Sequence, residues 1–385
     1  MTLAASQPAT RKAAPAEITT FSGEVVYLYA FDVAYEMLRR PVPQLLGQPV
    51  AQFVVDASKR SPRQLLFYRP QMVRLPPLER LGPQGPVRVE RIIKLLPIGA
   101  ISIMVRVPFS VKSLEELVGF HDLQFSNNTW LYDEVRALAQ DVQRELKPYL
   151  VRPVESLSDE EAYTVFCIRG PLKAADGAGC AAEDWLLQNR RRVAALLTEE
   201  RDATRLSEQE AEESTGRYLS YYDRDLVVVD WDAALVIDEP RFFDETLYLM
   251  ELANVQLAEL EAYDRMLDDA IERAYRDISR RRFRDRNRIQ NELREIRIDL
   301  ARLSEELSNI TKFFGDWHSA RIYQALSARF HLSDWHHAID EKLKTLDDLY
   351  QLLGSERNNR WMLILEVTIV LLFVLDLIVL IFGRR

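Results

Sequence analysis

Residues 361–382 read WMLILEVTIVLLFVLDLIVLIF, and this apolar run decides how the rest of the chain is expected to be organised. Seventeen of its 22 residues are Leu, Ile, Val or Phe. At about 1.5 Å of rise per residue, a helix of this length matches the ~30 Å hydrocarbon layer of a bilayer. The sequence therefore predicts one transmembrane helix here, with a buried core helix as the competing interpretation.

Two acidic residues, Glu366 and Asp376, interrupt the apolar run. An acid at the centre of a membrane helix costs about 2.5 to 3.5 kcal/mol, whereas seventeen apolar side chains contribute roughly −5 to −10 kcal/mol. Insertion is therefore expected. Because intramembrane acids usually face protein or water, the pair also predicts association between helices. The alternative is that both acids are protonated or reach the interface and have no role.

More basic residues precede the apolar run than follow it. Those before it are Lys342, Lys344, Arg357 and Arg360, and those after it are Arg384 and Arg385. Positive charge marks the cytoplasmic side of a membrane protein. The sequence predicts a single-pass, tail-anchored protein with its N-terminal body in the cytoplasm, at the bacterial inner membrane or, in a eukaryote, the mitochondrial inner membrane.

Composition limits the remaining classes. The net charge of −9, from 59 acidic and 50 basic residues, argues against a nucleic-acid surface over the whole protein. Two cysteines, Cys167 and Cys180, are typical of a reducing compartment rather than a disulfide framework. Residues 1–20, rich in Ala, Ser, Thr and Pro, are expected to form a disordered tail.

Residues 21–238 alternate short apolar strands with helical stretches, which predicts an α+β soluble domain of ferredoxin-like order. A loop near 169–183 could split it into two subdomains. The segments Arg88–Leu96 and Ala100–Val107 predict a β-hairpin, and a helix is expected near Val33–Arg40.

Residues 241–353 are expected to form a long helical stalk, because neither Pro nor Gly occurs between Arg241 and Phe314. One heptad seam comprises Ile289, Leu293, Ile296, Leu300, Leu303, Leu307, Ile310, Phe314 and Trp317. A second comprises Ile339, Leu343, Leu346, Tyr350 and Leu353. The seams predict an α-helical coiled-coil hairpin within one subunit, or pairing between subunits.

Six arginines cluster in the stalk: Arg280, Arg281, Arg282, Arg284, Arg286 and Arg288. Cations near anionic headgroups gain about 1 kcal/mol each, so the cluster is a candidate membrane-surface site. A solvated helix face with ion pairs, or RNA phosphate, are its alternative uses.

No catalytic signature or phosphate loop is recognisable, and no cofactor is predicted. His336, His337 and Asp340 have the spacing of metal ligands on one helix face but are only weak metal candidates, because packing at a helix corner, next to Trp335, is the favoured explanation. Cys167 lies in an apolar strand and is expected to be an inert buried thiol.

The motif Val236-Ile237-Asp238-Glu239-Pro240-Arg241-Phe242-Phe243, followed by Thr246-Leu247-Tyr248 and Tyr263-Asp264-Arg265, resembles the YagE-type domain of unknown function. This is the family of the sporulation protein required for meiotic nuclear division. Its members end in an apolar helix with a glutamate, as Glu366 stands here. The resemblance implies an α+β body, membrane attachment and self-association, with organellar relatives supporting translation.

Together these features predict a tail-anchored scaffold or interaction protein that self-associates and holds its α+β domain at the bilayer. Its expected partners are the lipid bilayer, further copies through the stalk and transmembrane helices, and a protein or RNA/ribosome partner; no small molecule is identified. The alternatives are a channel or transporter subunit using Glu366 and Asp376, and a membrane-bound enzyme with a site in 21–238.

Overall fold

The structure, a computed structural model, describes most of the chain. The described residues are 20–38, 40–53, 70–82, 85–126, 128–157, 160–172, 179–280, 294, 298 and 317–382. The chain divides into two compact units, which we describe separately. The first comprises Met1–Glu259 and Ser308–Leu332, and the second Leu260–Leu307 and Ser333–Arg385.

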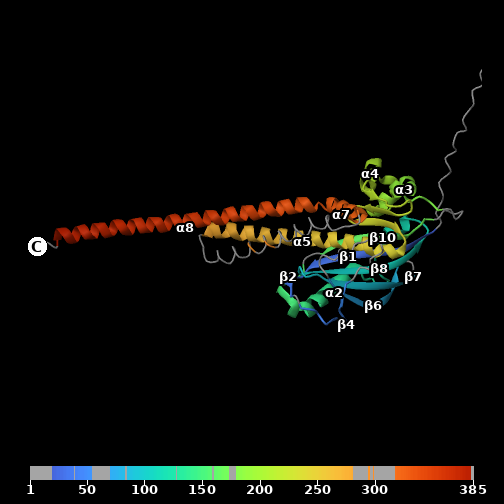
Figure 1. Ribbon diagram of the computed structural model, residues 1–385, viewed down its shortest axis with the longest axis horizontal. Helices are drawn as coiled ribbons and strands as arrows, with labels where there is room; N and C mark the ends of the chain where they lie inside the picture. Colours follow the sequence, from blue (N-terminus) through green and yellow to red (C-terminus); the bar gives the residue numbers. More distant parts are fainter. Residues whose placement is uncertain are drawn as a thin grey trace, which may run out of the picture. The chain divides into compact units, whose positions relative to one another are not determined.

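The described part of the first unit contains a mixed sheet of nine strands in the order β11-β12-β13-β10-β1-β8-β7-β6-β5 (Figure 1). Its strands are β1 (Phe21–Asp32), β5 (Ala51–Gln52), β6 (Gln71–Gly82), β7 (Gly85–Leu95), β8 (Ala100–Val111), β10 (Glu161–Arg169), β11 (Tyr218–Leu219), β12 (Leu226–Val229) and β13 (Ala233–Asp238). Among these strands, β10 and β13 are the one parallel pair.

Strand β1 lies at the centre of this sheet and is buried on both faces. Because side chains alternate along a strand, Val25, Tyr27 and Tyr29 point to one face and join the main hydrophobic cluster with residues of the neighbouring helices. Val26 and Leu28 point to the other face and are fully buried as well. A strand with two buried faces has a nearly continuous apolar sequence, which explains the run from Val25 to Phe31.

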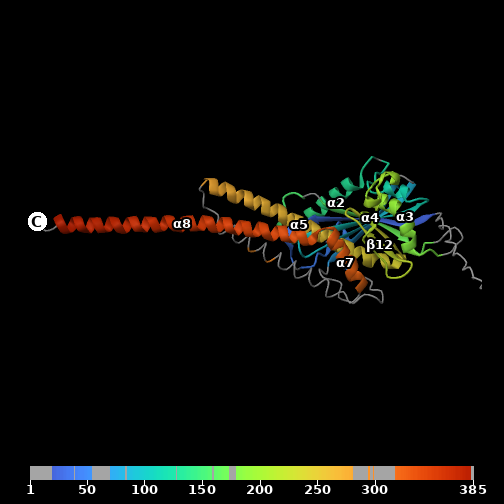
Figure 2. The same cartoon turned by 90° about the horizontal axis from the view of Figure 1, so that it is seen from above.

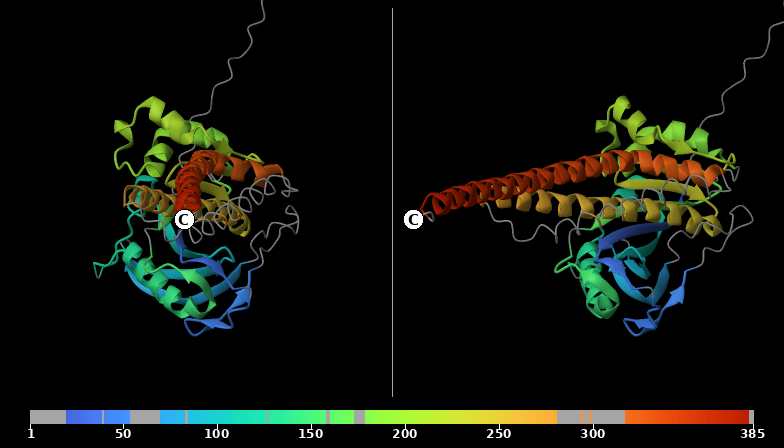
Figure 3. Two further views of the ribbon diagram at one scale, coloured as in Figure 1. Left: turned by 90° about the vertical axis from the view of Figure 1, so that its left-hand side faces the viewer. Right: turned by 60° about the vertical axis from the view of Figure 1, so that its left-hand side comes forward.

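Shorter elements and helices surround the sheet. The small strand pairs are β2 (Ala34–Met37) with β9 (Leu150–Pro153) and β3 (Gln44–Leu45) with β4 (Gln48–Pro49). The helices are α1 (Glu115–Val118), α2 (Leu131–Leu146), α3 (Ala182–Leu197), α4 (Glu208–Thr215), α7 (Trp317–Arg329) and the first part of α5 (Pro240–Arg280), with 3₁₀ turns η1 (Lys147–Tyr149) and η2 (Ala203–Arg205). Helices α3 and α4 lie side by side (Figure 3).

Helix α7 belongs to the first unit. Its Arg329 donates from Nε to Asp230 at 2.9 Å and from Nη1 to Glu213 at 2.8 Å. Phe330, which follows the helix, packs its ring edge against buried Tyr163 at 5.0 Å between centroids. These contacts bind α7 to the β12 side of the sheet.

The second unit contains the later part of α5 and the helix α8 (Leu332–Phe382), which run side by side (Figures 1 and 2). Lys342 Nζ of α8 lies 2.6 Å from Asp264 and 2.7 Å from Asp268 of α5. Leu267 of α5 and Leu343 of α8 are buried in the same unit.

The predicted fold class is wrong, because the sheet is larger than expected and has a different strand order. A ferredoxin-like order needs a small sheet, whereas β10 joins β1 to β13 and extends one sheet to nine strands. The helix expected near Val33–Arg40 is also wrong, because Ala34–Met37 pairs as β2 with β9. Local periodicity does not reveal such pairings between distant segments. The predicted hairpin of β7 and β8 is confirmed.

The coiled-coil hairpin predicted for residues 241–353 is also wrong. Helix α7 belongs to the first unit, and the chain turns at His331, with φ 50°, before α8 begins. The seam positions from Ile289 to Phe314 lie outside the described residues.

The expected transmembrane helix is overturned as well. In the part of the chain that the structure describes, no helix combines the length and apolar composition needed to cross a bilayer. The single-pass tail anchor and the membrane localisation deduced from 361–382 are therefore wrong. These residues are not a separate element but the continuation of α8, whose earlier turns are polar.

Gly99, in the turn between β7 and β8, offers a test of this architecture. Its φ is +95°, and a Cβ atom there would lie 1.9 Å from the Ala34 carbonyl oxygen. We expect Gly99→Ala to destabilise the protein by about 3 kcal/mol, through backbone strain and overlap with β2. The measurement is chemical denaturation. Gly119→Ala is the control, because no atom lies within 4 Å of its added Cβ; equal losses for both variants would contradict the described turn.

Candidate functional site

A cavity of about 470 Å³ opens at one edge of the sheet in the first unit. Because β10 and β13 are parallel, their carboxyl ends meet there, with Arg169 opposite Asp238. Strand β12 runs antiparallel to β13, so Asp225, directly before β12, comes to the same edge. Ligands of α/β sheets commonly bind outside the carboxyl ends of parallel strands.

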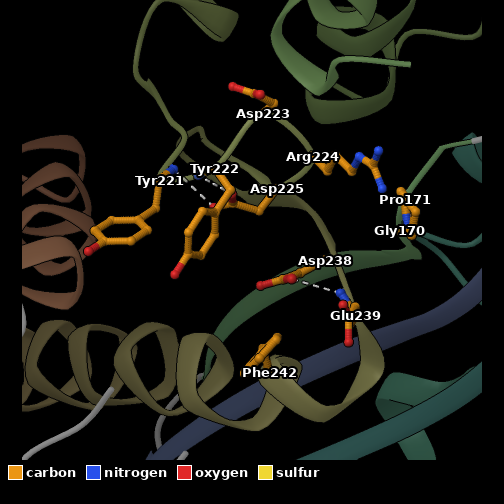
Figure 4. Close-up of a pocket in the computed structure, with 10 residues that line it drawn as sticks. All are labelled: Gly170, Pro171, Tyr221, Tyr222, Asp223, Arg224, Asp225, Asp238, Glu239 and Phe242. Atoms are coloured by element: carbon orange, nitrogen blue, oxygen red, sulfur yellow. Dashed lines mark hydrogen bonds between the residues drawn. The ribbon is translucent and has the colours of Figure 1, made fainter. Parts of the chain in front are cut away.

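The cavity walls combine acidic and aromatic side chains. Its lining residues are Gly170, Pro171, Tyr221, Tyr222, Asp223, Arg224, Asp225, Asp238, Glu239 and Phe242. Tyr222, Asp238 and Phe242 approach one another from three different segments, whereas Asp223 points away (Figure 4). The lining residues include four acids, Asp223, Asp225, Asp238 and Glu239, and one base, Arg224. The formal charge of the lining is therefore negative.

Backbone hydrogen bonds fix two of these carboxylates. Asp225 is buried and accepts from the backbone N–H groups of Tyr221, at 3.0 Å, and Tyr222. Asp238 Oδ1 accepts from the backbone N–H of Glu239 at 2.7 Å, immediately before α5. These backbone donors hold both carboxylates in fixed orientations.

A second cavity, of about 460 Å³, contains His121. Its Nδ1 lies 3.0 Å from the Glu199 carboxylate and its Nε2 2.6 Å from the carbonyl oxygen of Leu196, in the last turn of α3. Both ring nitrogens therefore face oxygen atoms of the segment that ends α3. His121 thus links the end of α3 to β10, where its ring packs against Phe166 at 4.9 Å between centroids.

A buried ion pair lies between the sheet and α5. Lys94 Nζ of β7 binds the Glu251 carboxylate of α5, which also accepts from Ser102 Oγ at 2.6 Å. Both charged side chains are only 5% exposed. The Lys94 ammonium lies 3.9 Å from the ring centroid of Phe53. A buried pair of this kind specifies how α5 sits on the sheet.

Most residues singled out in the sequence do not meet in this site. Arg280 lies at the end of α5 with its side chain outside the described set, and Arg281, Arg282, Arg284, Arg286 and Arg288 lie outside the described residues. Glu366 is exposed on α8, and the Asp376 side chain is also outside the described set. Their roles stay predictions.

The weak metal candidates lie on α8 in the second unit. His337 Nε2 lies 3.5 Å from Glu341, and burial lowers the pKa of His336, partly opposed by Asp340. Among the described residues, no group of three or more His, Cys, Asp or Glu side chains is placed to hold a metal ion. His336, His337 and Asp340 are therefore not brought together as a metal site.

Neither the pairing of Lys94 with Glu251 nor the grouping of the cavity carboxylates was predicted from the sequence. A signal for the first existed, because Lys94 interrupts the apolar run Ile92-Ile93-Lys94-Leu95-Leu96 and so marks a buried cation. Asp238 was visible within a motif, but its nearness to Tyr222 depends on strand order.

Comparison with known proteins identifies a different family from the expected one. A family model described as the N-terminal domain of the uncharacterised protein MJ0711 matches residues 22–244. The uncharacterised protein MJ0711 of Methanocaldococcus jannaschii is 24% identical over 219 residues, which are 57% of this chain and 65% of that protein. The match thus spans just under two thirds of the relative's length. No solved structure matches significantly.

The resemblance to the YagE-type family is therefore wrong. Its motif covers only the end of β13 and the start of α5, a local strand-to-helix junction. The family model instead extends over nearly the whole sheet.

Lys94→Met tests the buried pair. We expect a loss of about 3–5 kcal/mol of unfolding free energy, because the Glu251 carboxylate stays buried without its cation. The double variant Lys94→Met/Glu251→Leu should be more stable than Lys94→Met alone, as measured by urea denaturation. Additive losses from the two substitutions would show that the groups are not coupled.

Thiol alkylation tests the two cysteines. Burial raises the pKa of the fully buried Cys167 thiol well above its usual range. Cys180 is partly exposed, although burial and Asp184 raise its pKa too. We expect iodoacetamide to modify Cys180 but not Cys167 in the folded protein and both in denaturant, as read by peptide mass spectrometry. Native labelling of Cys167 would contradict its burial.

Proposed function

Because the chain belongs to the family of the uncharacterised MJ0711 N-terminal domain, whose description assigns no activity, we propose a function from its exposed surface: a self-associating interaction protein whose copies join through α8. The observation that carries the proposal is a run of exposed apolar side chains on this helix.

Eleven large apolar side chains in the described part of α8 are between 49% and 72% exposed. They are Met362, Ile364, Leu365, Val367, Ile369, Val370, Leu371, Leu372, Phe373, Val374 and Leu375. Consecutive residues of a helix are about 100° apart, so this run covers every side of α8. Contiguous exposed apolar surface of this kind marks an interaction site.

The free energy available supports assembly. Full burial of one such side chain contributes about 1.5–3 kcal/mol, so covering eleven half-exposed ones contributes roughly 10 kcal/mol per helix. Association costs about 4–15 kcal/mol in lost freedom of motion. A single neighbour covers one side of a helix only, so a bundle of more than two copies exploits the surface better than a pair.

A second copy of the chain is the partner that this surface fits best. In a homo-oligomer each subunit contributes the same apolar run. The exposed side chains of one α8 can therefore pack against those of α8 in other subunits. The earlier turns of α8, where Ile339, Leu343 and Leu346 are buried within the second unit, are separated from the run by the polar residues 355–360.

Sedimentation of the full chain tests self-association. We expect a mass several times the 44.7 kDa of one chain. The variant Leu365→Lys/Leu372→Lys, with two charges on one face of the run, should sediment as a monomer. Asp348→Lys is the control, because it adds positive charge to an exposed polar position of the same helix.

Three results would overturn the proposal. They are a monomeric parent chain, an unchanged mass in the double lysine variant, and uptake of the run by lipid vesicles without any change in protein mass.

Glu366 provides a second test of this assembly. It is exposed within the run, so a bundle would bury its carboxylate beside those of other copies. One polar residue in an apolar helix interface fixes register and copy number at a cost in stability. We expect Glu366→Leu to tighten association about tenfold and to broaden the distribution of copy numbers. Sedimentation across a dilution series measures both; weaker association would contradict the placement.

A further inference from the structure

We propose that assembly through α8 takes up protons at Glu366, so that a fall in pH strengthens the association between copies of the chain. The inference rests on the proposed self-association and names its regulation. Glu366 is the one ionisable residue among residues 362–375, and its side chain is exposed together with the eleven apolar side chains of the run.

The neighbours of Glu366 on the helix are apolar. Residues three or four positions apart lie on the same face of a helix. Of the neighbours at this spacing whose side chains the structure describes, Met362, Ile369 and Val370 are all exposed. An assembly that covers these three side chains therefore also covers the Glu366 carboxylate.

No cation in the run can compensate this charge. Residues 361–382 contain no Lys, Arg or His, and their other acid, Asp376, follows Glu366 by ten positions, or about 15 Å along the helix. Whichever way a second copy runs, the ionisable groups that its run contributes are its own Glu366 and Asp376, which are acids. Burial without a cation disfavours the charged form of a carboxyl group, and a like charge nearby disfavours it further.

A proton is the counter-charge that remains available to Glu366 in the assembly. The assembled state therefore binds more protons than the separate chains, in which Glu366 is exposed to water. By linkage, the state that binds more protons gains stability as the pH falls. Since one charged carboxylate in a bundle costs less than several, the uptake is expected to be below about one proton per chain.

Sedimentation of the full chain at about pH 8.5 and about pH 6 tests this inference. Both values lie above the isoelectric point of about 5.3, so the net charge stays negative. We expect the concentration at which half of the chains are assembled to fall about tenfold at the lower pH. Glu366→Gln keeps a polar side chain of the same size without its charge, and should assemble at both pH values as the parent chain does at the lower one. Protons released on dilution, followed with a pH indicator in weak buffer, measure the uptake directly.

Asp348→Asn is the matched control, because it removes one negative charge from an exposed position of the same helix outside the run. This variant should keep the full pH response of the parent chain. A parent chain that is monomeric at both pH values would contradict the proposed self-association itself. Assembly of the parent chain that does not depend on pH, or an equal pH response in Glu366→Gln, would overturn the role of Glu366 alone.

Discussion

The burial of β1 on both faces is the constraint on which the first unit depends. A strand that is apolar on both sides must be covered twice, by the helices packed around Tyr27 on one face and by α5 on the other. Polar contacts then specify how α5 lies: Asn254 donates to the carbonyl oxygens of Leu28 at 3.4 Å and Glu161 at 3.0 Å. Apolar burial supplies the driving force, and these directional bonds choose one arrangement.

The same arrangement creates the acidic cavity. Strand β10 pairs with β1 on one side and with β13 on the other, and the parallel sense of the second pairing brings Asp238 to the edge where the loop after β10 begins. The backbone N–H of Gly170 donates to the Asp238 carbonyl oxygen at 2.7 Å, which joins that loop to the start of α5. The cavity is therefore a product of strand order, and its acids come from segments far apart in sequence.

Sequence patterns could predict those elements whose signal is local. The hairpin of β7 and β8 follows from two apolar runs around Pro97-Ile98-Gly99, and α2 from the periodic burial of Val135, Ala139 and Val142. The sheet order could not be predicted, because β1 bonds to β10 more than a hundred residues away. The apolar run 361–382 led to the wrong prediction of a separate membrane helix for a related reason. The composition of these 22 residues does not show that they continue a helix that begins in a polar segment.

The cavity illustrates the same limit for functional residues. Asp225 and Asp238 are ordinary acids in the sequence, and only the antiparallel pairing of β12 with β13 makes them neighbours. Lys94 is the exception, because a lysine between Ile93 and Leu95 already requires a buried partner. The identity of that partner, Glu251, depends on where α5 crosses the sheet.

The first unit is built from two segments that are separated in the sequence. It is discontinuous because residues 260–307 belong to the second unit, which also includes Ser333–Arg385. The family match ends at residue 244, before α7 supplies Arg329 to Asp230. The apolar run of α8 belongs to the second unit and the cavity to the first, so changes in that run alter no residue that lines the cavity.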